Sequence, residues 1–152
     1  MAKAAHEAWF HLTSLLARVA LGLYFLLAGV GKVRGELQNG IGSFYESSFQ
    51  DLQPDWLPTF FAAPYGYALP WAEVVIGATL VLGLATRISA TLIALMLLSF
   101  TIALMIANGI SGGGPGPFHA NIVMLTLALM LITLGGGAIS VDAAFRGKKA
   151  TP

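Results

Sequence analysis

The sequence predicts an all-α integral membrane protein, built as a bundle of four transmembrane helices. Of its 152 residues, 57% are hydrophobic and 10% are charged, and the mean hydropathy is +0.78. A typical soluble domain contains about 25% charged residues. In addition, Ile88–Val141 is a stretch of 54 consecutive residues without Asp, Glu, Lys or Arg. A bilayer core about 30 Å thick requires about 20 apolar helical residues, so this stretch holds two spans and a connection between them.

Four predicted spans follow one another in a single membrane domain that comprises residues 1–152. They cover residues 12–31, 65–85, 89–107 and 119–134. The first span is apolar apart from Arg18 and lacks a convincing signal-peptide cleavage site before Lys32, so we expect a retained anchor. The second span is apolar apart from Glu73. The third and fourth are separated by the run GGGPGP (112–117), which neither a helix nor a strand accommodates.

Small residues within the predicted spans indicate where the helices pack. Lipid supplies no hydrophobic drive between helices, so close approach of their backbones contributes more of the association energy. Pairs of small residues at helical spacing occur in the first three spans: Gly22 and Gly29, Thr79 and Gly83, and Ala90 and Ala94. These pairs predict the contact stripes of a compact bundle.

The distribution of basic residues predicts that both termini are cytoplasmic. An even number of spans places them on one side of the membrane, and short cytoplasmic loops carry an excess of Lys and Arg. That side would hold Lys3, Arg87, Arg146, Lys148 and Lys149. The roughly 30-residue loop between the first two spans, residues 32–64, is then external. Its aromatic residues predict a segment at the lipid headgroups, with Trp56, Phe60 and Phe61.

Glu73 is the strongest candidate for a functional residue, because an ionisable side chain at membrane depth costs about 2.5–3.5 kcal/mol on insertion scales. The sequence places it about 12 Å below the outer end of the second span, at 1.5 Å per residue. It also follows Pro70, which donates no backbone hydrogen bond. Arg18 and Lys32 are long enough to lean toward Glu73 from opposite ends of the first span, so we expect a charge-paired core.

Three interpretations of Glu73 stay open at the level of the sequence. In the first, Glu73 forms a buried ion pair with Arg18 or Lys32 and thereby fixes the packing of the first two spans. In the second, Glu73 faces a cavity, where it handles a proton or anchors a quinone or another polar-headed ligand. In the third, Glu73 contacts another subunit.

The remaining polar residues, and the absence of Cys, limit the cofactors and ligands that the protein could bind. His119 and Asn121, at the start of the fourth span, could line the outer mouth of a site near Glu73. His6 and His11 lie on the other side of the membrane from His119, so no histidine pair at one depth is available to a haem. The absence of Cys excludes disulfides and Cys-ligated metals. No metal-ligand spacing or phosphate-binding loop occurs, and a net charge of +1 gives no attraction to nucleic acid.

Three blocks of sequence resemble the DoxX-like family of small four-helix membrane proteins. In the first block, RVALGLYF (18–25) leads to GVGK (29–32), similar to the family's first-helix pattern of Arg, Gly, Phe, Gly and Lys. In the second, Glu73 is followed by Gly and Leu residues up to Arg87. The third, GGGAISVD (135–142), is similar to the family's ending.

The resemblance implies a fold, a membrane location and membership of a larger complex, but it does not imply a particular reaction. The family is named after a small subunit of a thiosulfate:quinone oxidoreductase. By this resemblance the chain would be an accessory or anchoring subunit of a quinone-linked or other energy-converting complex in the cell (inner) membrane of a prokaryote. Its partners would be the lipid bilayer and other subunits, and its polar core would consist of Arg18, Lys32 and Glu73. Many members carry an acidic residue near the start of the last helix, where this chain has His119 and Asn121.

An alternative follows from the residues themselves. The chain would be a small membrane carrier or ligand-binding protein that uses Glu73 beneath the outer loop. We expect no covalently bound cofactor and no metal, and a quinone or a lipid is the candidate ligand. Catalysis by the chain alone is the least favoured hypothesis, because without Cys or a haem-ligating histidine pair it would need a bound quinone to move electrons.

Overall fold

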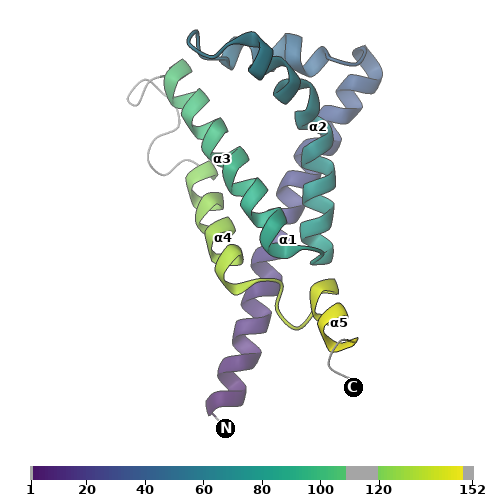
Figure 1. Ribbon diagram of the computed structural model, residues 1–152, viewed down its shortest axis with the longest axis vertical. Helices are drawn as coiled ribbons and strands as arrows, with labels where there is room; N and C mark the ends of the chain where they lie inside the picture. Colours follow the sequence, from purple (N-terminus) through teal and green to yellow (C-terminus); the bar gives the residue numbers. More distant parts are fainter. Residues whose placement is uncertain (1, 109–119, 149–152) are drawn as a thin grey trace.

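Helices make up most of the structure, a computed structural model that describes residues 2–108 and 120–148, with side chains described for residues 6–106 and 120–145 (Figure 1). The longer helices are α1 (Ala2–Asn39), α2 (Thr59–Leu82), α3 (Thr86–Asn108), α4 (Ala120–Leu134) and α5 (Val141–Lys148). Two short helices, η1 (Tyr45–Phe49) and η2 (Gln50–Leu52), lie in the connection between α1 and α2. The described residues contain no strand, so the predicted all-α class is confirmed.

Three helical segments are long and apolar enough to cross a membrane, namely His6–Asn39, Thr59–Leu82 and Thr86–Ile106. Their length and composition identify an integral membrane protein. The fourth predicted span corresponds to α4, which is apolar but has only 15 residues, or about 22 Å at 1.5 Å per residue. His119, the predicted first residue of that span, lies outside the described residues.

Helices α1 to α4 run alternately up and down in the orientation of Figure 1. The start of α1, the turn between α2 and α3, and α5 lie at what we call the lower end, and the connection 40–58 lies at the upper end. α1 packs mainly against α2, and α3 against α4. From their short turn, α2 and α3 diverge toward the upper end (Figure 1). α1 extends below its neighbours, because its 38 residues measure about 57 Å.

The helix boundaries differ from the prediction around the first connection. α1 continues to Asn39 and α2 begins at Thr59, so the non-helical part of the predicted loop is shorter than expected. The charged segment after Lys32 contains no proline and stays helical until Gly40, whose φ of 103° is accessible mainly to glycine. α2 also ends before the predicted residue 85, because Gly83 adopts a φ of 72° and caps the helix.

Glycines allow the backbones of α1 and α2 to approach closely. A Cβ atom on Gly29 would lie 2.7 Å from the backbone nitrogen of Val74, and one on Gly77 would lie 2.5 Å from that of Leu26. Gly22 makes a similarly close contact with α2. The predicted stripe in the first span is therefore a helix–helix contact that side chains would obstruct.

The other predicted stripes have different outcomes. Ala90 and Ala94 are buried in the core. Thr79, however, hydrogen-bonds to Ser89 across the turn between α2 and α3, with the two hydroxyls 3.0 Å apart. Gly83 ends α2 instead of continuing a stripe along it. The second span therefore contributes Gly77, rather than Thr79 and Gly83, to the close contact.

Candidate functional site

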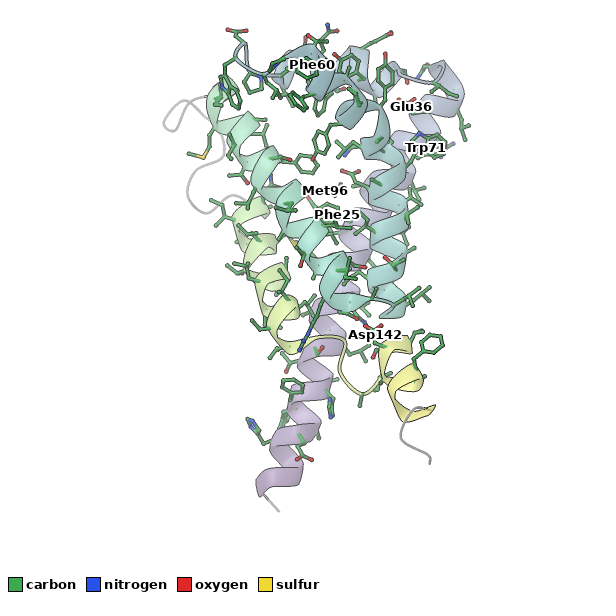
Figure 2. All side chains as sticks on the ribbon, in the orientation of Figure 1. Phe25, Glu36, Phe60, Trp71, Met96 and Asp142 are labelled. Atoms are coloured by element: carbon green, nitrogen blue, oxygen red, sulfur yellow. The ribbon has the colours of Figure 1, made fainter. Side chains whose placement is uncertain are left out.

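A cavity of about 560 Å³ lies between α1, α2 and α3, beneath the connection 40–58. We call it the upper cavity. Its volume falls within the range of about 300–1,000 Å³ that is typical of small-molecule sites. Phe25, which Figure 2 shows at mid-height between the helices, is part of its lining. The other large apolar lining residues include Phe44, Phe49, Trp56, Leu57, Tyr65, Leu69 and Phe100.

Lys32 and Glu73 form an ion pair on the wall of the upper cavity, with Nζ 2.5 Å from Oε1. The Glu73 side chain is 2% exposed and the Lys32 side chain 25%. The second carboxylate oxygen of Glu73, Oε2, is buried and has no hydrogen-bond partner among the described residues. Because an unsatisfied buried acceptor is costly, Oε2 of this cavity-lining residue requires a donor.

The two charged side chains meet because of the way in which α1 and α2 cross. Gly29 lies against Glu73, since a Cβ atom on Gly29 would be 2.8 Å from the Cβ of Glu73. Lys32 is three residues further along α1 and therefore on the same face of the helix. Because glycine has no side chain, α1 approaches α2 closely at Gly29, and Lys32 can therefore reach the carboxylate of Glu73.

Two aromatic rings contact the ammonium group of Lys32. Its Nζ lies 5.0 Å from the ring centroid of Phe44 and 5.6 Å from that of Phe100. Cation–π contacts of this kind contribute about 0.5–2 kcal/mol, with the larger values for desolvated pairs. Phe44 comes from the connection and Phe100 from α3, so three parts of the chain surround one cation.

Glu36 holds this arrangement in place, although it is not among the residues that the sequence predicts for the site. Its side chain is buried, and its carboxylate accepts hydrogen bonds from the backbone N–H of Gly42 and from that of Phe44, the latter at 2.8 Å. Glu36 lies at the upper end of α1 (Figure 2). The available signal was an acidic residue at a helix end, followed by Gly40 and Gly42 in a turn whose N–H groups need acceptors.

A second hydrogen bond links α2 to α3 beside the cavity. The hydroxyls of Tyr65 and Ser99 are 2.8 Å apart, and both residues line the upper cavity. Ser99 donates its hydroxyl proton to the carbonyl of Met96 at 2.8 Å, so Tyr65 is the donor in the pair. No spacing in the sequence relates these two residues, and the sequence therefore gives no prediction of this contact.

Arg18 does not join the pair, contrary to the expected charge-paired core. Its guanidinium donates hydrogen bonds to the carbonyls of Gly136, at 3.0 Å, and Ile139, at 2.7 Å. Arg18 is about 21 Å from Lys32 along α1 at 1.5 Å per residue. The glycine-rich segment after α4 offers nearer acceptors, and these carbonyls, rather than Glu73, are its partners.

Arg18 belongs to a second group of residues, which we call the lower polar cluster: Ser14, Arg18, Gly135–Gly137, Ile139 and Asp142. The Ser14 hydroxyl donates to the carbonyl of Gly135 at 2.6 Å. The Asp142 carboxylate accepts the backbone N–H groups of Ala85, at 2.7 Å, and Thr86, at 2.8 Å, and thereby caps α3. Figure 2 shows Asp142 at this junction of the lower end.

The remaining predicted residues have separate outcomes. Asn121 is buried at the start of α4 and lines the upper cavity together with Lys32 and Glu73. His119 lies outside the described residues. In the part of the chain that the structure describes, no group of three or more His, Asp or Glu side chains could hold a metal ion.

Together, the fold and the site define a small helical membrane protein with a buried carboxylate–ammonium pair on the wall of an aromatic cavity. The chain belongs to the family of the methylamine utilisation protein MauE, whose model matches residues 10–134 and so includes the whole cavity lining. A protein of Bacillus subtilis (strain 168), named "Putative oxidoreductase CatD", is 28% identical over 141 residues, which are 92% of each chain. No solved structure matches the chain.

The predicted membership of the DoxX-like family is wrong, because the family model that matches is that of MauE. The blocks that carried the resemblance have general structural roles. Gly22 and Gly29 allow α1 to contact α2 closely. Arg18 and residues 135–142 form hydrogen bonds that connect α1, the segment after α4 and the start of α3 at the lower end. Small helical membrane bundles commonly need small residues at contacts and paired polar groups, so such features do not distinguish one family from another.

Proposed function

We propose that the protein is an accessory membrane protein of an oxidoreductase system and that it binds a small amphiphilic molecule in the upper cavity. One observation carries the proposal: a cavity of about 560 Å³, whose largely apolar lining includes several aromatic rings, has the Lys32–Glu73 pair on its wall. Ionisable groups at membrane depth mark functional sites. The relative named as an oxidoreductase supports the setting.

In the membrane, we propose four spans with both termini cytoplasmic, in the cell membrane of a prokaryote. The alternating direction of α1 to α4 supports the span count, and the start of α1 and α5 lie at the same end. Basic residues such as Arg87 and Lys148 belong to this lower end and favour the cytoplasmic side. The connection 40–58, with exposed Trp56, and the start of α2, with exposed Phe60, then meet the headgroups on the opposite side.

Co-purification tests the proposed function. The natively expressed protein is purified from gently solubilised membranes, its partner chains are identified by mass spectrometry, and bound small molecules are extracted into organic solvent. We expect oxidoreductase subunits and one amphiphile in stoichiometric amounts. The amphiphile should be lost from the double variant Lys32→Met/Glu73→Leu.

The matched control is Glu46→Gln, which removes a carboxylate from an exposed position outside the cavity lining. This variant should retain the amphiphile. Wild-type protein that purifies alone and without any bound molecule would contradict the proposal.

A further inference from the structure

The upper cavity contains a buried acceptor that the described residues leave unfilled. Oε1 of Glu73 is occupied by the Lys32 ammonium at 2.5 Å, whereas Oε2 has no hydrogen-bond partner among those residues. The Glu73 side chain is 2% exposed, so bulk water does not reach it. Buried carboxylate oxygens are normally hydrogen-bonded. A molecule that fills this cavity is therefore bound best when it carries a hydrogen-bond donor for Oε2.

The Lys32 side chain is more exposed than that of Glu73, at 25% against 2%, but its ammonium already has partners on several sides. One of its N–H groups is donated to Glu73, and the rings of Phe44 and Phe100 lie 5.0 Å and 5.6 Å from Nζ. A ligand that needed a donor would compete with these contacts. The pair also opposes a charged head group, since a cation would meet the ammonium and an anion the carboxylate. The site thus favours a neutral head that donates a hydrogen bond.

The remaining lining favours a flat aromatic head. Phe25, Phe44, Phe49, Tyr65 and Phe100 reach the cavity from α1, the connection, α2 and α3. Aromatic rings pack well against one another at centroid separations of about 4.5–7 Å. A cavity of about 150 Å³ is sufficient for benzene, so a volume of about 560 Å³ accommodates a ring together with an apolar substituent.

We propose that the ligand of the upper cavity is an apolar-substituted phenol whose hydroxyl donates to Oε2 of Glu73. The inference rests on the proposed function and deepens it by naming the head group. Oε2 supplies the acceptor, the aromatic side chains hold the ring, and the apolar remainder of the cavity takes the substituent.

Two matched pairs of compounds test this inference: para-octylphenol with its methyl ether, and dodecanol with its methyl ether. Binding to the protein in lipid nanodiscs is measured by calorimetry, with empty nanodiscs as the blank. The phenol should bind at least about tenfold more tightly than its ether, the size expected for one hydrogen bond to a charged group. In Lys32→Met/Glu73→Leu this preference should disappear, and in Glu46→Gln it should remain.

Each other outcome overturns a defined part of the inference. Equal wild-type binding of phenol and ether overturns the hydrogen bond to Oε2 but leaves the cavity as a binding site. An equally large preference for dodecanol over its ether overturns the aromatic head. Failure of all four compounds to bind overturns the phenol inference, whereas the proposed function is judged separately by the molecules and chains that co-purify.

Discussion

At the scale of single residues, the Lys32–Glu73 pair is asymmetric. The Glu73 side chain is almost fully buried, whereas a quarter of the Lys32 side chain is exposed. Removal of one partner from a buried ion pair leaves the other charge uncompensated. A stranded Lys32 retains solvent contact and two aromatic rings, but a stranded Glu73 has neither. The cost of breaking the pair therefore depends on which residue remains.

We expect Lys32→Met to lower the free energy of unfolding more than Glu73→Leu does. Loss of one partner in a buried pair costs about 3–5 kcal/mol, and we assign this range to Lys32→Met. The double variant should recover most of the loss, because apolar residues of similar volume replace buried pairs well. Thermal unfolding in detergent, monitored by circular dichroism, measures the relative stabilities of the two single variants and the double variant. A double variant that is as unstable as Lys32→Met would show that the loss does not come from a stranded charge.

The sequence predicts the members of this site better than their contacts. It predicts a pairing of Lys32 with Glu73, which the structure contains, but it also assigns Arg18 to this pair. Depth along a helix is a one-dimensional measure, and it contains no information about the carbonyls that compete for a guanidinium. Glu36 and Tyr65 escape prediction for a related reason, since their partners come from segments that only the folded chain brings together.

At the scale of helices, the contact between α1 and α2 depends on the absence of particular side chains. Gly29 and Gly31 offer a direct comparison, because both lie in α1 but only one faces a neighbour. A Cβ atom on Gly29 would meet the backbone of α2, whereas one on Gly31 would have nothing within 4 Å. The two glycines thus have the same helix propensity and opposite packing requirements.

We expect Gly31→Ala to leave the free energy of unfolding unchanged or to raise it by up to about 1 kcal/mol, through better helix propensity. Gly29→Ala gains the same propensity but has to separate two helices, and overpacking costs about 1–3 kcal/mol. It should therefore lower the melting temperature relative to Gly31→Ala. Equal melting temperatures for the two variants would mean that α1 and α2 can move apart without cost.

Hydropathy predicts which segments cross the bilayer, but the ends of the helices follow other rules. α1 extends past its apolar segment to Asn39, because a helix can continue into water. α2 stops at Leu82, because the backbone conformation of Gly83 ends it. Turn geometry of this kind is decided by φ and by capping hydrogen bonds, which a hydropathy average does not contain.

At the scale of the whole molecule, the proposed topology has a direct test, since the natural chain contains no Cys. Single substitutions Glu46→Cys, in the connection, and Ala144→Cys, in α5, introduce one thiol each at exposed positions. A membrane-impermeant maleimide should label the first in intact cells and the second only after permeabilisation. Labelling of both from one side would contradict the four-span arrangement.

The lower polar cluster and the upper cavity lie at opposite ends of the bundle, and this separation has a mechanical consequence. Hydrogen bonds at the lower end join α1, the start of α3 and the segment after α4, while α2 and α3 diverge above them. The α1–α2 pair and the α3–α4 pair are therefore joined at the lower end and separate toward the upper end. A small change in the angle between the helices at Asp142 or Arg18 would therefore produce a larger change in the width of the upper cavity, although neither residue lines it.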